Sequence, residues 1–280
     1  MNTAQDEATG PGPLAVAAER LGAKIFGVLG HIGAIWALLT QATLWVWRSA
    51  VQRRVRFGRP AVISQVVRVG VGSVLIVTLV SSAVGFILGL QMAPPLDNLG
   101  QVRLVPNIIA VAVVRELGPL IAAIVLTGFA GAAIAAEIGT MVVGEEIEAL
   151  EAHALNPVRF LVVPRLIATT GSLVCLAVLS NYAAVGAGLV MSRLVLGIPP
   201  HAYIQSTLDQ LGPRDFLTGL AKAGVFGLLI GLIACANGLK VTGGAAGVGR
   251  ATTNTVVESV VAIIFADLIF TAIFYAVGWT

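Results

Sequence analysis

Charged residues are scarce in this chain. Only 11% of its 280 residues are Asp, Glu, Lys or Arg, whereas 57% are hydrophobic. Soluble domains carry about 25% charged residues, so this composition excludes an ordinary soluble domain. Several apolar runs reach the roughly 20 residues that a helix needs to cross a bilayer, and backbone groups in lipid must be hydrogen-bonded internally. Runs of this length predict an all-α integral membrane protein.

Cysteine is also nearly absent, and the N-terminus lacks basic residues. The two cysteines, Cys175 and Cys235, lie in apolar runs, which favours helix packing over a disulfide or a metal site. The stretch MNTAQDEATGPGP is polar and acidic, so we do not expect a cleavable signal peptide. We expect no cofactor and no metal. The net charge of +3 requires no nucleic-acid partner, because the basic residues fall where membrane topology requires them.

Five apolar stretches predict membrane-spanning helices. They cover 69–93, 107–139, 166–192, 216–238 and 254–279. A sixth stretch, 14–47, is apolar but carries three tryptophans, Trp36, Trp45 and Trp47, and tryptophan prefers the headgroup region. We interpret residues 1–60 as an N-terminal tail and an interfacial amphipathic helix lying along the membrane, with a sixth span as the alternative.

The basic residues indicate the orientation. One set of loops and helix ends holds 12 of them: Arg20, Lys24, Arg48, Arg53, Arg54, Arg56, Arg59, Arg68, Arg159, Arg165, Lys240 and Arg250. The opposite loops hold three: Arg103, Arg193 and Arg214. The positive-inside rule makes the first set cytoplasmic, which places the N-terminus inside and the C-terminus outside. On the outer side, the prolines of 94–106 predict a loop, and HAYIQSTLDQL predicts a short amphipathic surface helix.

Acidic residues gather in one cytoplasmic linker. The segment GEEIEALEAH, 144–153, holds four glutamates in seven positions: Glu145, Glu146, Glu148 and Glu151. Helical spacing places Ile147 and Leu150 on one side and the acidic side chains on another, over about three turns that end at Asn156-Pro157. The segment is either a solvated connector or a docking helix for a cytosolic partner with a basic groove, in which the apolar residues anchor and the glutamates steer.

Four ionisable residues lie well inside the predicted spans: Arg115, Glu116, Lys222 and Asp267. At 1.5 Å per residue, the depths of Arg115, Lys222 and Asp267 from the outer helix ends come to roughly 12–18 Å. An unpaired charge at such a depth costs at least about 2.5–3.5 kcal/mol, so we expect these residues to pair within the bundle. The network either holds the helices in register or forms a polar belt beside a substrate path. Pro119 also frees the carbonyl of Arg115 and predicts a kink.

Glycine patterns suggest close helix contacts and exclude one nucleotide site. Gly85 and Gly89, and Gly227 and Gly231, form GxxxG motifs, which fit either internal packing or a dimer. The segment GGAAGVGRATT, 243–253, has the glycine separation of a phosphate-binding loop, but Arg250-Ala251 stands where that motif has Lys-Ser/Thr, and no strand precedes it. We predict a flexible turn here, with Thr252 or Thr253 capping the last span. Any ATP hydrolysis then belongs to another subunit.

Three long motifs resemble one family. VVRELGPLIAAIVLTGFAGAAIAAEIGTM, EEIEALEAHALNPVRFLVVPRLIA and GAAGVGRATTNTVVESVVAIIFADLIFTA occur in this order, and together they are similar to the MlaE/YrbE permease family of ABC-type lipid transporters linked to MCE-domain proteins. The resemblance covers roughly 65–280 and implies a permease domain over 61–280. It further implies two permease copies in the bacterial inner (plasma) membrane, two cytosolic ATPase subunits below them, an MCE protein on the outer side, and a phospholipid or related lipid as the substrate.

The resemblance also assigns residues. The family's coupling helix, which contacts the ATPase, falls on 144–152 and includes Glu145, Glu146, Ile147, Glu148 and Leu150; the family often has Thr-Glu-Gln where this chain has Gly144-Glu145-Glu146. The membrane charges of such permeases fall on Arg115, Glu116, Lys222 and Asp267. The lipid pocket is lined mainly by the first two spans, where the candidate residues are Phe86, Leu90, Gln91, Ile109 and Val113.

Two other function classes make different demands on the sequence. An ion-coupled secondary transporter would use Glu116 and Asp267 as proton carriers, and its transport would collapse with the proton gradient. An intramembrane enzyme would need a catalytic set within the spans, but there is no HExxH motif, and His31, His153 and His201 all lie near predicted surfaces.

Overall fold

Helices form the whole described structure. The computed structural model describes residues 13–51 and 59–278, and this part of the chain contains helices, turns and loops but no strand. Within it, six helical stretches are long and apolar enough to span a membrane: Leu29–Arg48, Pro60–Asn98, Val102–Val143, Val158–Leu196, Pro213–Leu239 and Gly244–Ala276. The predicted all-α membrane fold is confirmed. Arg53, Arg54, Arg56 and Trp279-Thr280, which contributed to the predicted orientation, lie outside the described residues.

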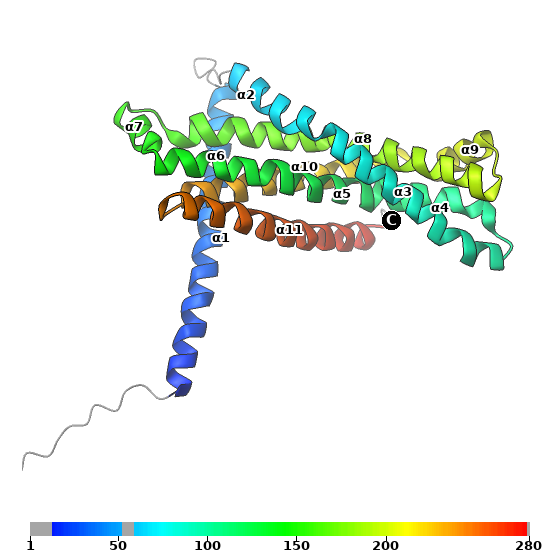
Figure 1. Ribbon diagram of the computed structural model, residues 1–280, viewed down its shortest axis with the longest axis horizontal. Coiled ribbons are helices and arrows are strands. Elements are labelled where there is room, and N and C mark those ends of the chain that lie inside the picture. The colour runs from blue at the N-terminus through cyan, green and yellow to red at the C-terminus, as the bar shows by residue number, and fades with distance from the viewer. Residues whose placement is uncertain (1–12, 52–58, 279–280) are drawn as a thin grey trace, which may run out of the picture.

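Five of the long stretches run along the length of one bundle (Figure 1). The first consists of α2 (Arg59–Val66), the π turn η1 (Val67–Val71) and α3 (Gly72–Asn98). The second is η2 (Val102–Leu104), α4 (Val105–Ala112), η3 (Val113–Leu117), α5 (Gly118–Leu126), η4 (Thr127–Gly131) and α6 (Ala132–Val143). The others are η5 (Val158–Val162) with α8 (Val163–Leu196), α10 (Pro213–Leu239) and α11 (Gly244–Ala276).

Two short helices mark opposite ends of the bundle. The helix α7 (Glu146–Ala152) joins α6 to η5 at one end, and α9 (Pro200–Gln210) joins α8 to α10 at the other (Figure 1). A stretch of 39 residues, such as Val158–Leu196, extends about 58 Å at 1.5 Å per residue, whereas the hydrocarbon core is only about 30 Å thick. The bundle is therefore long enough for both ends to stand outside the hydrocarbon.

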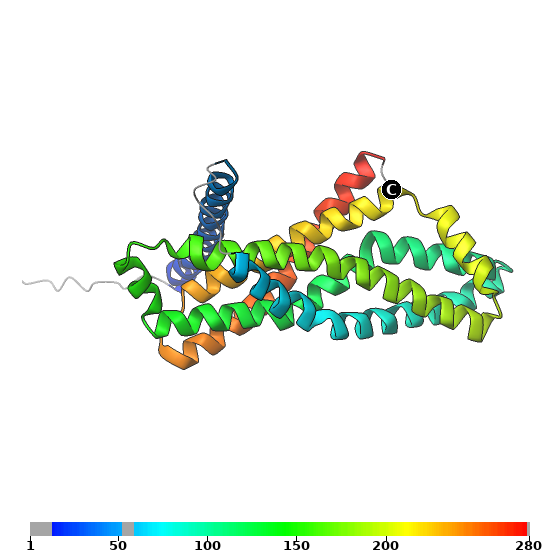
Figure 2. The same ribbon diagram turned by 90° about the horizontal axis from the view of Figure 1, so that it is seen from above.

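The N-terminal helix α1 (Pro13–Val51) lies across the bundle instead of along it (Figures 1 and 2). It contacts α10, η5 and α8 near the end that carries α7. Trp45 contributes to this contact, because the guanidinium group of Arg159 on η5 lies 5.5 Å from the centre of its ring. Arg48, on α1 itself, lies at the same distance from that ring. This direction across the five long stretches favours the interfacial helix over the sixth span, although Leu29–Arg48 is long and apolar enough for either.

The centre of the bundle is held by close contacts at glycines. On α3, an added Cβ at Gly85 would lie 2.0 Å from the carbonyl oxygen of Ala184 on α8. On α10, a Cβ at Gly227 would lie 2.8 Å from the Cα of Thr170, also on α8. Both GxxxG motifs thus serve packing within the chain, since only glycine allows the backbones to approach this closely.

Several predicted helix ends are wrong, and the helices are longer than expected. Pro94 and Pro95 lie inside α3, where we expected a loop, and the connection between α3 and η2 shrinks to 99–101. The last span begins at Gly244 instead of 254, so Thr252 and Thr253 lie within α11 and do not cap it; their hydroxyls donate to the carbonyl of Gly249. The short helix predicted from HAYIQSTLDQL is present as α9.

Candidate functional site

A buried lysine joins three helices in the middle of the bundle. The side chain of Lys222 on α10 is 1% exposed, and its Nζ lies 2.6 Å from Glu116 Oε2 of η3 and 2.9 Å from Asp267 Oδ1 of α11. The ammonium also donates to Thr271 Oγ1 at 2.9 Å, and the Thr271 hydroxyl donates to Glu116 Oε1 at 2.9 Å. We call these four residues the central cluster. The predicted pairing of Glu116, Lys222 and Asp267 is confirmed.

Arg115 is not part of the central cluster, although we predicted that it would be. Its Nη2 lies 2.7 Å from Asp215 Oδ1, and the Asp215 side chain is 7% exposed. Asp215 sits in the first turn of α10, where its other oxygen accepts the backbone N–H of Gly212 at 2.8 Å. The Gly-Pro-Arg-Asp sequence at 212–215 could have indicated this, because an acidic residue at that position completes a helix start.

The second span departs from α-helical geometry just before a proline. The π turn η3 precedes Gly118-Pro119, and the Gly118 N–H donates to the carbonyl of Val113, five residues earlier. The irregularity expected from Pro119 is therefore present as a π turn, as is common at functional sites. Next to it, the Ser180 hydroxyl donates to the carbonyl of Gly118 at 3.0 Å, and Ser180 and Ser81 lie 2.7 Å apart. These serines tie α3 and α8 to the span that carries Glu116.

The acidic helix α7 is shorter than predicted. It spans seven residues, about two turns, and ends at Ala152, two residues before Ala154 adopts a left-handed conformation with φ 57°. Asn156-Pro157, expected to stop this helix, instead begins η5, where the Asn156 side chain accepts the N–H of Arg159 at 3.2 Å. Pro157 thus helps to start a helix, because its fixed φ suits the first turn.

The exposed surface of α7 is anionic, and its two large apolar residues are partly accessible. All four glutamates are exposed, whereas Ile147 and Leu150 are half-buried. Only Gly144 and Glu145 separate α6 from α7, and Glu145 holds φ 59°, a left-handed conformation that costs a non-glycine residue roughly 1–2 kcal/mol. Because the connection is so short, a movement of α7 would also move the end of α6.

Sequence reasoning missed a second ion cluster, near the α7 end. Glu137 on α6 lies 2.8 Å from Arg165 Nη2 of α8 and 2.6 Å from Arg68 Nη1 of η1. We had assigned Arg68 and Arg165 to cytoplasmic linkers, but both lie within helices, and the Arg165 side chain is only 5% exposed. The linkers expected at 48–68 and 139–165 extend into the helices that begin at Arg59 and Val158, and this error hid the cluster.

A third polar group ties α1 to the bundle. His31 Nε2 lies 3.1 Å from Glu258 Oε2 of α11, and His31 Nδ1 lies 3.1 Å from Lys240 Nζ at the end of α10. The Asn237 amide donates to the same Glu258 oxygen at 2.8 Å. His31 is half-buried, and its predicted position near a surface gave no indication of this contact.

The candidate lipid-binding residues lie near one another but differ in burial. Ile109 and Val113 are buried in a hydrophobic cluster with Ala184 and Met191, and Phe86 packs against that cluster. Leu90 and Gln91, near the end of α3, are exposed. Because residues 94 and 95 are prolines, the carbonyls of Leu90 and Gln91 have no helical i+4 N–H donor.

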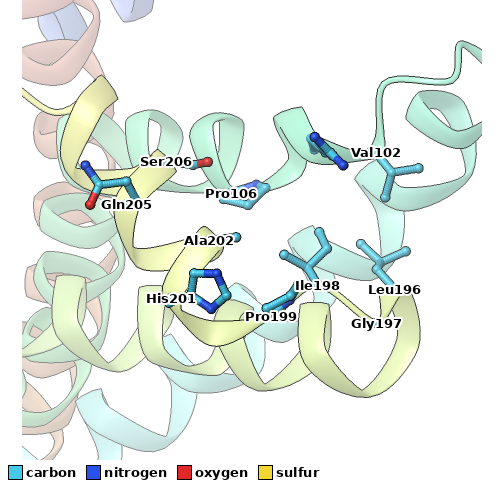
Figure 3. Close-up of a pocket in the computed structure, with 11 residues that line it drawn as sticks. Val102, Pro106, Leu196, Gly197, Ile198, Pro199, His201, Ala202, Gln205 and Ser206 are labelled. Atoms are coloured by element: carbon cyan, nitrogen blue, oxygen red, sulfur yellow. The ribbon is translucent and has the colours of Figure 1, made fainter.

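The end of the bundle opposite α7 carries an open cavity of about 730 Å³. Figure 3 shows the side chains that surround it: His201, Gln205 and Ser206 from α9, with Val102 and Pro106 from the start of the second span. Tyr203 anchors α9 beneath this cavity. It is buried, its hydroxyl donates to the carbonyl of Val185 at 3.1 Å, and burial raises its pKa above the ordinary value of 10.0, so it stays a neutral donor.

Comparison with known proteins identifies the family. The family model described as Permease MlaE matches residues 62–273. A "Probable ABC transporter permease protein" of Rickettsia felis is 35% identical over 216 residues, which cover 77% of this chain and 83% of the relative. A probable ABC transporter permease of Synechocystis is 36% identical over 212 residues, covering 76% and 81%. The chloroplastic "Protein TRIGALACTOSYLDIACYLGLYCEROL 1" of Arabidopsis thaliana is 35% identical over 213 residues, covering 76% and 61%. The chain therefore belongs to the MlaE family of ABC transporter permeases.

Proposed function

We propose that this permease moves phospholipid, or a related lipid, between the bacterial inner membrane and an MCE-protein assembly, driven by a separate ATPase subunit. The observation that carries the proposal is the exposed anionic helix α7, joined by two residues to a span that reaches the central cluster. The name of the Arabidopsis relative contains that of a galactolipid, which supports a lipid as the substrate.

The first step of the proposal is that α7 is the contact for the ATPase. Glu145, Glu146 and Glu148 steer a basic groove toward it, and Ile147 and Leu150 anchor in the groove. ATP binding closes the ATPase pair and moves α7, and the short connection transmits this movement to α6. The orientation follows: the α7 end faces the cytoplasm together with the N-terminus, and α9 faces the outer side.

The second step is that another permease copy, identical or paralogous, covers the central cluster. The side chain of Glu116 is 35% exposed in the single chain, and that of Asp267 is 18% exposed. A carboxylate at this depth that faced hydrocarbon would be strongly unfavourable, so such residues face a bundle interior or a water-filled path. A second copy across this face supplies either environment.

The third step concerns the lipid. The side chains of Leu90 and Gln91 are exposed near the outer end of α3, and their carbonyls lack a helical N–H donor. Phe86, one turn earlier on α3, extends this surface toward the middle of the bundle. We propose that these residues contact the lipid directly, while the buried Ile109 and Val113 support the wall behind them. The cavity between α9 and the second span gives the MCE protein a surface to contact at the same end.

Charge reversal on α7 tests the proposal. The variant Glu145→Lys/Glu146→Lys/Glu148→Lys should fold normally, because all three side chains are exposed, but should not co-purify with the ATPase. The matched control, Asp97→Lys/Asp209→Lys, reverses exposed carboxylates at the opposite end and should retain the ATPase. Normal co-purification of the α7 variant removes the docking role.

A lipid measurement tests the substrate. Mass spectrometry of the complex purified in mild detergent should identify bound phospholipid, and Leu90→Asp/Gln91→Asp should reduce its amount. In reconstituted vesicles, lipid transfer should require ATP and persist when a protonophore collapses the proton gradient. Loss of transfer with the gradient, without a requirement for the ATPase, would instead favour the ion-coupled transporter that uses Glu116 and Asp267.

A further inference from the structure

The glycine-rich segment between α10 and α11 forms a compact turn with a defined backbone. Gly243 and Gly244 hold φ 84° and 66°, conformations that glycine adopts most readily. A Cβ at Gly247 would lie 2.0 Å from the carbonyl oxygen of Thr242, so the first turn of α11 packs directly on this backbone. The glycines that suggested a nucleotide loop therefore serve to bring the ends of α10 and α11 together.

A polar pocket of about 160 Å³ opens at this turn. Asn237 and Gly247 form its buried base, and the exposed side chains of Lys240, Arg250 and Asn254 form its rim. Two cations thus converge on a small polar space between two membrane-spanning helices. Among residues 13–51 and 59–278, Arg250 has only a long contact to a protein acceptor, 3.4 Å from the carbonyl of Thr242, which leaves most of its guanidinium donors available.

The nearest carboxylate does not neutralise these cations. Glu258 is one helical turn from Asn254, but its Oε2 is occupied by the Asn237 amide at 2.8 Å and by His31 at 3.1 Å. Lys240 donates toward the other nitrogen of His31 at 3.1 Å, and an ammonium has three donors, so two remain for a ligand. The rim keeps its net positive charge.

An apolar crevice continues from the pocket along the same helix seam. It has a volume of about 680 Å³ and is lined by Gly27, Ile32 and Ile35 of α1, Ile233 of α10, and Val257, Val261 and Ala262 of α11, with His31 and Glu258 also in its wall. Ile233 is one turn from Asn237, and His31 and Glu258 bond to residues of the polar pocket. The two spaces therefore adjoin, with the crevice on the side away from the turn between α10 and α11.

We propose that the pocket and the crevice together hold one anionic phospholipid of the leaflet on the α7 side. Lys240 and Arg250 bind its phosphate, and an acyl chain fills the crevice beneath α1. Basic pockets between spans on the cytoplasmic side bind anionic headgroups in this way, and the adjoining apolar space distinguishes a lipid from a free anion. The site lies at the opposite end from the proposed substrate surface, and binding requires neither ATP nor transport.

Native mass spectrometry of the full chain in mild detergent tests this site. Titration with phosphatidylglycerol should show one tightly retained lipid, and phosphatidylcholine should bind more weakly. The variant Lys240→Gln/Arg250→Gln should bind phosphatidylglycerol roughly 25-fold more weakly, at about 1 kcal/mol for each cation, and phosphatidylcholine as before. Arg193→Gln/Arg214→Gln, with the same loss of charge at the other end, should bind as wild type does.

Two further variants separate the lipid from other causes. Arg250→Gln alone leaves the Lys240–His31 contact intact and should still weaken binding about fivefold, so a loss cannot be assigned to detachment of α1. Gly27→Leu projects a side chain into the crevice, with no protein atom within 4 Å of its Cβ, and should also displace the lipid. Unchanged phosphatidylglycerol binding in Lys240→Gln/Arg250→Gln would overturn the proposal. It would also be overturned if inorganic phosphate competed fully with the lipid and Gly27→Leu bound the lipid normally, because the site would then recognise a free anion. Because no ATPase is present, failure here leaves the transport proposal intact.

Discussion

Removal of Lys222 should destabilise the bundle more than removal of Lys222 and Glu116 together. The Lys222 ammonium is 1% exposed and lies within 2.9 Å of two carboxylates and one hydroxyl, so Lys222→Met leaves two neighbouring negative charges without a counter-ion. Breaking a buried ion pair from one side costs about 3–5 kcal/mol. For a chain of this size that corresponds to a fall in melting temperature of roughly 5–15 °C.

Neutralising Glu116 in the same protein should recover part of this loss. Lys222→Met/Glu116→Gln leaves only one unpaired carboxylate, and the new amide can still accept the Thr271 hydroxyl. Because Glu116 is 35% exposed and partly solvated, the recovery should be about 1–2 kcal/mol and not the whole loss. Adding Asp267→Asn should recover more.

Thermal unfolding of the purified variants in one detergent measures these differences. Arg193→Met, which removes an exposed charge outside the cluster, serves as the control and should melt as wild type does. Coupled residues give non-additive losses. If the double variant melts lower than Lys222→Met by the full cost of Glu116→Gln alone, the two residues do not interact and the central cluster is not an energetic unit.

Three further predictions follow from the packing and the ion pairs. In a double-mutant cycle measured by thermal unfolding, Arg115→Met and Asp215→Asn should show a coupling energy of about 1–3 kcal/mol. The stability losses of Arg115→Met and Glu116→Gln should instead be additive. Glu137→Gln should cost about 3–5 kcal/mol in the same assay, because its buried arginine partner loses its counter-ion; wild-type melting would contradict this. Gly85→Ala should lower the melting temperature strongly because its Cβ meets backbone at 2.0 Å, whereas Gly89→Ala, facing the mobile end of a methionine side chain, should have little effect; equal losses would refute the packing argument.

The depth of a charged residue along its helix was predictable from the sequence, but the side of the helix from which its side chain projects was not. Glu116, Lys222 and Asp267 were expected to meet because their distances from the helix ends agree, and they do meet. Arg115 has nearly the same depth, yet neighbouring residues project about 100° apart on a helix, so Arg115 and Glu116 face different partners. Without the relative rotation of the helices, depth alone could not separate the two ion pairs.

Helix ends were the least predictable feature, and they concealed functional residues. Pro94 and Pro95 suggested a loop, but a helix tolerates proline where the freed carbonyls are exposed. The start of α11 resembled a linker, because its glycine, alanine and threonine residues carry no apolar periodicity. Both errors shortened the spans and left Arg250 in a linker, although it lies within α11. A similar error at residues 68 and 165 hid the ion pairs that Arg68 and Arg165 make with Glu137.

The position of α1 gives the protein a built-in optical probe. Trp36 and Trp47 are 66% and 64% exposed on α1, whereas Trp45 is held between two arginines. The first two indoles should therefore be quenched by brominated acyl chains, and bromine positions near the headgroup should quench them most if the helix lies flat. With Trp45 and Trp279 replaced by phenylalanine, the remaining fluorescence should thus report how deeply this helix sits.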